Sequence, residues 1–544
     1  MRMNIVEPTS EVPPPGTVLL LDESQNPLEN RHLKHGTGKH SNVVLVPQPS
    51  KDPNDPLLWS RWRKEAAFFT IFLNAIIFAS CPGPLLSSST FVLSGILHVP
   101  LGKISELGGY QLMVSGIVGP FVSVLAQKYG KRPQFVAAGV FGTLGTAICI
   151  AGAHQSSYSV LMAGRVVQGL GATAFESISL ASVGDLYYLH ERGRRMGLVV
   201  LTLACMSSVV SIISGVITHN LGWVYLFDIS LPFNIVGLLG VILFLPETQF
   251  RRLVDSEQQP SDAEMQTKAD ETLVKAMQQQ SDGAVLDKRI SRQTYIHSLR
   301  IFTGTYSSAG FLKGFANIFM HLLNPAVVWI LTTTGVIVVC AVLQGTTTPK
   351  DLVADILHIN QSLFTGLAYI LSQIWSVAPY SLNVQQCGYF FTGAFLGGIL
   401  AVSGGPICDA VSRRMAHLNN GIYEPEFRIP VNLLAAAILA LGWFVFMWNL
   451  DHPSPTGYYL GAFCHGCIVF GVTITSTTGS LYILDAFPQH ATEIFILQMT
   501  TKNLLFFMFS KFINAWEVRV GGGHIMKVFG AITMALLATS IPMC

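Results

Sequence analysis

Charged side chains are scarce in this sequence. Asp, Glu, Lys and Arg make up 12% of its 544 residues, while 50% are hydrophobic; an average soluble domain has about 25% charged residues. So few charges cannot cover a water-exposed surface, and the composition therefore indicates a membrane protein. The formal net charge of +2 says nothing about nucleic acid, and no nucleic-acid partner is expected.

Other features are also missing. The first sixty residues are polar and Pro-rich, with no apolar core near the start, so a cleaved secretory signal is not expected. Cysteines occur singly apart from the C-x-x-C pair Cys464 and Cys467, and a small apolar role within spans explains them better than a metal or redox site. The sequence contains no His-rich box, nucleophile elbow or phosphate-binding loop, so neither an enzyme nor a cofactor is expected.

Long apolar runs, by contrast, fill the chain. Runs near twenty residues in length, which is enough to cross a bilayer, occur six times in the first half and seven times in the second, where one run is doubtful. They lie at 66–92, 107–126, 133–153, 158–182, 196–218, 224–245, 325–345, 363–376, 388–404, 429–449, 457–479, 494–514 and 521–541.

These runs predict an all-α integral membrane protein with two six-helix bundles. We expect an N-terminal tail over 1–62, a first bundle over 63–248, a polar connector over 249–322 and a second bundle over 323–544. Most of the connector has a composition typical of mobile segments. The second bundle carries extra residues at about 342–366, which are open to four interpretations: an outer-loop insertion, a broken seventh span, an extra short helix or a translated intron.

Lys and Arg gather in alternate loops between the runs. Because such residues accumulate on the cytosolic side of a membrane, this alternation predicts that both ends of the chain face the cytosol. The residues concerned are Arg61, Arg63, Lys64, Lys128, Lys131, Arg132, Arg192, Arg194, Arg195, Arg251, Arg252, Arg413, Arg414 and Arg428.

Two short stretches recur at corresponding places in the two halves. "LAQKYGKRPQF" (125–135) and "GGPICDAVSRR" (404–414) each lie between the second and third spans of their half, and "GDLYYLHERG" (184–193) is echoed by "GSLYILDAFP" (479–488). Two six-span halves joined as parallel repeats are typical of a large class of secondary transporters.

On these motifs the chain resembles the major facilitator superfamily, in particular its fungal twelve-span drug and metabolite proton antiporters. The family's signature between spans two and three is matched by Lys128, Gly130, Lys131 and Arg132. Ser123 and Gln127 replace its glycine and aspartate. The second copy keeps the glycine and the aspartate and adds two arginines, as Gly405, Asp409, Arg413 and Arg414.

The resemblance implies the major facilitator fold, whose two bundles are related by pseudo-two-fold symmetry, and a gating role for these loops. In the family, the aspartate helps to latch the halves together. Its absence at Gln127 implies a weaker latch on the N-terminal side, or one carried by Asp185 and Arg132. Arg192, in the loop after the fourth span, is a further gating candidate. The strings at 45–65 and 419–430 resemble the fungal branch. The antiporter signature expected in span five reads "VSIISG" (210–215) and keeps only Gly215, which weakens the case for efflux by antiport.

Charged residues inside a bilayer are costly and are functional candidates by default. At 3.6 residues per turn, Arg165, Gln168 and Glu176 share one helix face, which we expect to line a central cavity. Glu176 is the candidate for proton coupling or for binding a cationic substrate; the alternative is a static pair with Arg165 that only holds the helix in place. Lys502 and His465 are further candidates. A packed neutral histidine explains His465 better than proton coupling does, while Lys502 either snorkels or faces the cavity.

The stretch "ASCPGPL" (79–85) places two prolines and a glycine inside the first span. Proline breaks the helical hydrogen-bond ladder. The break either turns backbone groups toward a binding cavity or is a simple packing kink.

Together these features predict a proton-coupled transporter that exports a small drug-like molecule or secondary metabolite. The expected partners are that molecule, protons and the lipid bilayer, the expected state is a monomer, and the expected location is the plasma membrane. Two alternatives remain: proton-coupled uptake of an organic cation such as a polyamine, and a solute sensor that does not transport.

Overall fold

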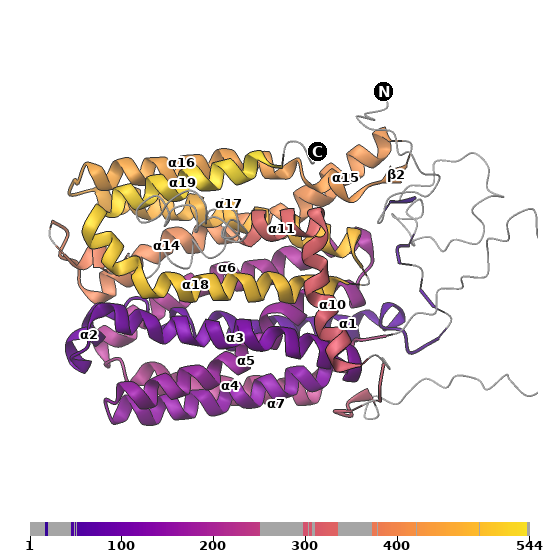
Figure 1. Cartoon of the computed structure of the whole chain (residues 1–544), viewed down its shortest axis with the longest axis horizontal. Coiled ribbons are helices and arrows are strands. Elements are labelled where there is room, and N and C mark those ends of the chain that lie inside the picture. The colour runs from indigo at the N-terminus through magenta and orange to yellow at the C-terminus, as the bar shows by residue number, and fades with distance from the viewer. Residues whose placement is uncertain are drawn as a thin grey trace, which may run out of the picture.

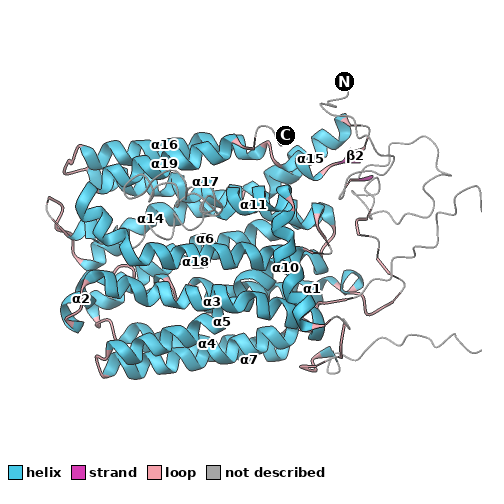
Figure 2. Ribbon diagram, viewed as in Figure 1, coloured by secondary structure: helices cyan, strands magenta, loops and turns pink. Residues whose placement is uncertain are grey.

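The computed structural model describes residues 17–19, 45–47, 49–50, 52–250, 298–302, 304–306, 310–335, 371, 373–377, 379–419, 421–488 and 490–540. Long helices run side by side in two bundles, coloured indigo to magenta for the N-terminal half and orange to yellow for the C-terminal half (Figure 1). Helix dominates the described residues (Figure 2). Their strands, β1 (Val18–Leu19) and β2 (Ile422–Tyr423), pair antiparallel with Val18 opposite Tyr423.

The N-terminal bundle contains seven α-helices, which begin after the short 3-10 turn η2 (Pro56–Leu58). They are α1 (Arg61–Asn74), α2 (Thr90–Leu97), α3 (Leu101–Tyr129), α4 (Lys131–His154), α5 (Tyr158–Leu186), α6 (Leu189–Asn220) and α7 (Tyr225–Phe244).

The described part of the C-terminal half follows a similar plan. Its elements are α10 (Phe311–Met320), η5 (His321–Leu323), α11 (Pro325–Gly335), α14 (Val384–Ala401), α15 (Gly404–Leu418), η6 (Pro425–Arg428), α16 (Val431–Asp451), α17 (Gly457–Ala486), α18 (Ala491–Val520) and α19 (Gly522–Ala538).

Many of these helices have the length and composition of membrane spans. Among the described residues, seven helices are long and apolar enough to cross a bilayer. An eighth span is obtained if α10 to α11 is counted as one span bent by 87°. Large apolar side chains point outward along α7, among them Phe233 and Val236, which are 61% and 62% exposed. Such a surface suits lipid tails, so the all-α membrane fold predicted from the sequence is confirmed.

The first span is broken where the sequence predicts it. Regular helix α1 ends at Asn74, a π-helical turn (Ala75–Ser80, η3) follows, and a 3-10 turn (Pro84–Leu86, η4) leads into α2. Because proline has no N–H to donate, the carbonyl groups of this turn are open to other donors.

Two helix pairs form the most extensive contacts between the two bundles. Helix α3 runs along α18, and α6 runs along α14 (Figure 1). Small residues allow this approach, as at membrane helix interfaces in general: the Thr500 hydroxyl donates to the Gly116 carbonyl at 3.0 Å, and Gly215 lies against Gly388. Of these spans, α5 and α17 are the most enclosed: 83% and 89% of the residues in their 18-residue apolar stretch are buried.

The region expected to be a polar connector ends in a helix. Residues 249–322 include α10, which packs on α3 with the Phe315 and Phe121 rings 5.1 Å apart. This packing follows from the apolar side chains at the end of the segment, which were assigned to the connector because the polar composition precedes them. Most of the connector and the whole of the 342–366 insertion lie outside the described residues.

Candidate functional site

An ion pair between the two bundles lies at the centre of the molecule. Lys502 on α18 donates to a carboxylate oxygen of Glu176 on α5. The other oxygen accepts from Asn503 Nδ2 at 2.9 Å and from the Ser115 hydroxyl at 3.5 Å. The two charged side chains are only 8% and 16% exposed. Glu176 is therefore held by both halves at once.

A small cavity adjoins this ion pair. Its volume of about 20 Å³ is enough for about one water molecule. The walls come from α5, α6, α17 and α18 and mix apolar with uncharged polar groups around the ion pair: Leu180, Val200, Ser476, Ser480, Phe495, Gln498 and Met499. In this structure the space between the bundles is too small for an organic molecule.

Arg165 and Gln168 lie elsewhere than Glu176. The Arg165 guanidinium donates to the Pro82 carbonyl in the broken first span and, at 3.2 Å, to the side-chain oxygen of Gln168. Gln168 in turn donates to the Thr146 hydroxyl on α4 at 2.8 Å. Both residues are therefore bound inside the N-terminal bundle, and neither is among the residues that line the small cavity.

The structure pairs Glu176 with Lys502, whereas the sequence gave a static pair with Arg165 as an alternative. Arg165 precedes Glu176 by eleven positions, which corresponds to about 16 Å along a helix. Arg165 and Glu176 share a helix face but are too far apart along the helix to be in contact. The cation that pairs with Glu176 comes from the other half.

His465 is fully buried on α17. Its ring stacks on Phe390 with centroids 5.5 Å apart and meets the Phe391 ring edge to face at 5.6 Å. This aromatic packing inside the C-terminal bundle is the structural alternative that the sequence left open for this residue.

The signature loop of the N-terminal half is a single residue. Gly130 lies between α3 and α4 with φ of 96°, a left-handed conformation that favours glycine. A side chain there would also overlap the Glu247 carboxylate. That carboxylate accepts from the backbone N–H groups of Lys131 and Arg132, both at 3.0 Å, as expected at a positively polarised helix N-terminus.

Glu247 itself lies just beyond α7. Burial raises the pKa of Glu247 above its ordinary value, although hydrogen bonds from backbone N–H groups act in the opposite direction. No sequence motif pointed to this residue.

The structure shows Lys131 on Asp185, where the sequence offered Arg132 as one alternative. Lys131 Nζ donates to Asp185 Oδ2 at 2.6 Å. The Arg132 guanidinium instead donates to the carbonyl groups of Ile242 and Leu299, each at 2.8 Å. Arg132 points toward α7 and the connector because it is the second residue of α4, whereas Lys131 faces α5.

Gln127, where the family has an aspartate, makes a bridge between the halves. Its side-chain Nε2 donates to Glu493 Oε1 at 2.5 Å. The other oxygen of Glu493 accepts from His490 Nδ1 at 2.7 Å and His321 Nε2 at 2.9 Å. An amide can donate to this carboxylate, while an aspartate would repel it, so the departure from the family pattern matches its new partner.

The same three groups have the spacing of metal ligands. One ligand atom each from His321, His490 and Glu493 lies within 4.8 Å of the others, and two histidines with one carboxylate form a common zinc set. Within the described residues, hydrogen bonding among them already accounts for this arrangement.

The second signature copy forms a larger buried network. Arg428 Nη1 donates to Asp409 Oδ1 at 2.9 Å, and its Nε donates to Asp485 Oδ2 at 2.6 Å. Arg192, from the N-terminal bundle, donates to the other oxygen of Asp485 at 3.4 Å. Asp485 therefore connects the halves. Gly405 lies directly against the backbone of Gly193, so a side chain there would overlap the Gly193 carbonyl.

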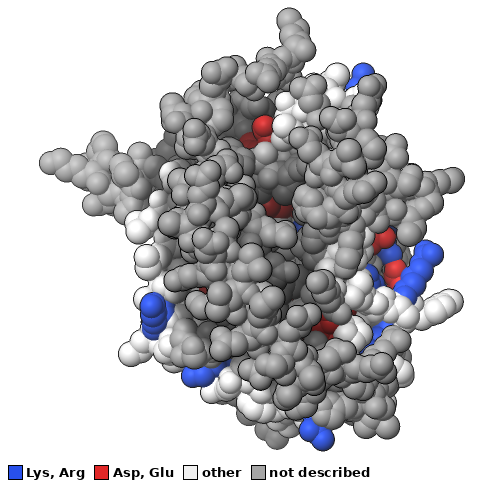
Figure 3. Space-filling model, turned by 90° about the vertical axis from the view of Figure 1, so that its right-hand side faces the viewer, with Lys and Arg blue, Asp and Glu red and all other residues white. Residues whose placement is uncertain are grey.

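Three of the expected gating residues have peripheral positions. The Lys128 ammonium lies 5.7 Å from the centre of the Tyr129 ring. Arg413 and Arg414 are exposed, and Arg413 Nε donates to the backbone carbonyl of Asp409 at 3.2 Å. The loops that carry these residues gather at one end of the molecule, called the basic end below, onto which Figure 3 looks.

The degraded span-five signature has a packing role. Ser211 and Ser214 on α6 hydrogen-bond to the hydroxyl groups of Ser87 and Ser88, each pair at 2.7 Å. Gly215, the one residue kept from the signature, lies against Gly388 of the other half. These serines join the broken first span to α6.

The end opposite the basic end is also bridged. Lys511 on α18 pairs with Glu106 on α3 at 3.0 Å and donates to the Tyr110 hydroxyl at 3.1 Å. Polar bridges thus join the halves at both ends and in the middle, so the structure is an occluded state of a two-bundle membrane protein.

Several residues of these bridges carried no motif signal. They are Ser115, Glu106, His321, His490, Glu493, Asn503 and Lys511. One available signal was the presence of acidic residues, Asp485 and Glu493, beside the ends of apolar spans and opposite Arg-rich loops.

Two bundles that meet around a buried charge pair, with a cavity between them, are typical of secondary transporters that work by alternating access. Residues 66–510 match the family model described as "Major Facilitator Superfamily". The chain belongs to this superfamily.

Fungal relatives and a solved structure agree with this assignment. The chain is 24% identical to an uncharacterized MFS-type transporter, C1271.10c, of Schizosaccharomyces pombe, over 97% of this chain and 91% of that protein. It is 24% identical to a probable efflux pump, mfs2, of Aspergillus flavus, over 78% and 88%, and 22% identical to Protein HOL1 of Saccharomyces cerevisiae, over 97% and 94%.

The fold is also similar to that of the human organic anion transporter MFSD10. The TM-score is 0.53 at 13% identity, over 89% of this chain and 100% of that one. The likeness at this identity concerns the fold alone, and the twelve-span plan expected from the resemblance is consistent with it.

Proposed function

We propose that this protein exports a small organic molecule, a drug or a secondary metabolite, in exchange for protons. The observation that carries the proposal is the Glu176 carboxylate, which is buried between the bundles on Lys502 and Asn503 of the opposite half. The efflux-pump name of the relative from Aspergillus flavus supports the direction of transport.

The coupling follows from the charge on Glu176. As a carboxylate it attracts Lys502 and ties α5 to α18. A proton on Glu176 removes that attraction and leaves the ammonium without its counter-charge, which is costly in a buried site. Protonation therefore loosens the contact between the halves, and opening of the cavity becomes linked to proton binding and release.

The proposal includes an orientation in the membrane. We place the basic end in the cytosol because Lys and Arg accumulate there, which also puts both ends of the chain inside. The protein then acts as a monomer in the plasma membrane, with two bundles that rock about the cavity.

Transport into proteoliposomes tests this function. A panel of labelled lipophilic drugs and polyamines is offered to wild type, Glu176→Gln and the matched control Glu191→Gln, with an imposed proton gradient and with an uncoupler. We expect gradient-driven drug movement in wild type and in the control, and its loss in Glu176→Gln, because glutamine cannot exchange a proton. Drug movement by Glu176→Gln at the wild-type, gradient-dependent rate would refute the coupling role.

Uptake of an organic cation is the second candidate, and one contact favours it. Lys502 places an ammonium group against Glu176, and a polyamine carries the same group. Gradient-driven accumulation of polyamines, but not of drugs, would establish uptake. Binding without movement of any compound would establish a solute sensor.

A further inference from the structure

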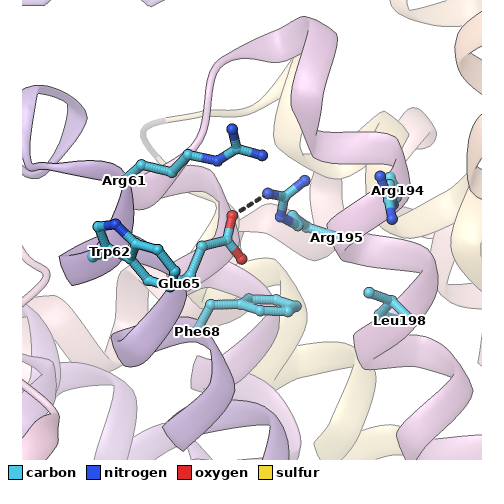
Figure 4. A pocket seen from close by; sticks show the side chains of 7 residues that line it. All are labelled: Arg61, Trp62, Glu65, Phe68, Arg194, Arg195 and Leu198. Carbon is cyan, nitrogen blue, oxygen red and sulfur yellow. Dashed lines mark hydrogen bonds and ion pairs between the residues drawn. The ribbon is translucent and has the colours of Figure 1, made fainter.

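A second pocket lies outside the site between the bundles, at the basic end of α1 and α6. Its volume is about 490 Å³. Arg61, Trp62, Glu65 and Phe68 line it from α1, and Arg194, Arg195 and Leu198 line it from α6. Figure 4 shows the three guanidinium groups around the mouth, with Phe68 and Leu198 below them.

The charge of this pocket is unbalanced. Arg195 pairs with Glu65, and its guanidinium also lies 4.6 Å from the centre of the Tyr187 ring. Arg61 and Arg194 are exposed, and among the described residues neither has an ion pair with an acidic group. Three arginines against one carboxylate leave two positive charges at the mouth.

The surroundings are those of a membrane interface. Trp62 is 87% exposed beside Arg61, and Phe69, about two turns further along α1, is 61% exposed. Tryptophan is enriched where the bilayer meets water. The floor of the pocket, by contrast, is formed by the apolar side chains of Phe68 and Leu198, and Phe68 is only 7% exposed. The pocket therefore presents guanidinium groups at headgroup level and an apolar surface toward the acyl chains.

We infer that this pocket binds the phosphate headgroup of an anionic lipid. Guanidinium groups bind phosphate oxygens in a bidentate manner, and basic pockets between membrane helices on the cytosolic side are typical sites for such headgroups. The inference rests on the proposed orientation, which puts the basic end in the leaflet that contains most anionic lipid.

Lipid binding to the purified full chain in detergent tests this inference. Wild type is titrated with phosphatidylinositol 4-phosphate and with phosphatidylcholine, and bound lipid is counted by native mass spectrometry. We expect the first lipid to bind and the second to bind far more weakly. Arg61→Gln/Arg194→Gln should weaken binding of the first lipid by roughly 30-fold, from about 1 kcal/mol for each cation removed.

The control is a second exposed arginine pair at the same end. Arg413→Gln/Arg414→Gln removes the same charge from the other bundle and should bind lipid like wild type. Equal losses in both variants, no loss in the pocket variant, or equal binding of phosphatidylcholine would overturn the inference.

A soluble competitor separates a lipid from a free phosphate ester. Inositol 1,4-bisphosphate should fail to displace the lipid at equal concentration, because it lacks the apolar tail that contacts the floor. Full displacement would assign the pocket to a soluble phosphate ester instead. No substrate or proton gradient enters this measurement, so its failure is distinct from a failure of the proposed export.

Discussion

Single side chains decide how this protein departs from its family. At Gln127 an amide has replaced the acidic group of the family signature, and its hydrogen-bond partner in the other half, Glu493, is itself acidic. The two positions therefore form a matched pair: only one of them can be a carboxylate.

Restoring the acid tests this pairing. Gln127→Asp places a carboxylate near Glu493, whereas Gln127→Asn has the same shape without the charge. Because the two variants differ only in charge and like charges repel, we expect Gln127→Asp to be less stable than Gln127→Asn by about 1 kcal/mol. Thermal unfolding of the two purified variants at neutral pH gives the comparison; equal stability would show that the bridge contributes nothing.

The sequence predicted individual charged residues better than their partners. Glu176 and Lys502 were each identified as costly charges inside the membrane, yet they lie 326 positions apart, and periodicity along one helix cannot reveal such a contact. Arg165 was assigned to the same site as Glu176 because both share a helix face. Which residues actually meet depends on how the bundles pack, and this information is not contained in local spacing.

At the scale of elements, helix existence was predicted well and helix geometry less well. Among the described residues, apolar length alone placed most of the long helices, and Pro82 and Pro84 placed the break in the first span. The 87° bend between α10 and α11 and the helix in the expected connector were missed, because both depend on packing against α3 and α18.

The turn before α18 provides a pH-dependent element. A hydrogen bond to Glu493 raises the pKa of His490. A histidine with a raised folded pKa stabilises the protein below its ordinary value of about 6.5, and this contribution is lost as pH rises through the folded pKa. The His490 to Glu493 contact should therefore weaken from slightly acidic toward alkaline pH.

Thermal unfolding between pH 6 and pH 8.5 measures this effect. We expect the loss of stability with rising pH to be smaller in His490→Gln than in wild type. His524→Gln, an exposed histidine at the opposite end, serves as control and should keep the wild-type slope. Identical slopes in all three proteins would exclude a contribution from His490.

For the whole molecule, the bridges at the two ends differ in burial. Arg192 and Asp485 have side chains only 5% and 1% exposed, while Lys511 at the opposite end is 36% exposed. Exposed pairs contribute about 0–1 kcal/mol, whereas removing one partner of a buried pair costs about 3–5 kcal/mol. The basic end is therefore the more firmly closed of the two.

Removing the two cations in turn tests this difference. Arg192→Gln leaves Asp485 with its partner Arg428, so the network within the C-terminal bundle persists. We expect this variant to separate the bundles at the basic end, and Lys511→Gln to separate them less, at the opposite end. Spin-label distances between the bundles report both changes; a larger opening in Lys511→Gln would contradict the ranking.

The one-residue junction at Gly130 has a mechanical consequence. Because only Gly130 separates α3 from α4, a displacement of one helix is passed directly to the other. The junction is fastened to the connector, because Arg132 donates to the Leu299 carbonyl and the Lys128 carbonyl accepts from the Tyr306 N–H. We therefore expect a displacement of α3 relative to α18 to be transmitted through these two hydrogen bonds to residues 299–306 of the connector.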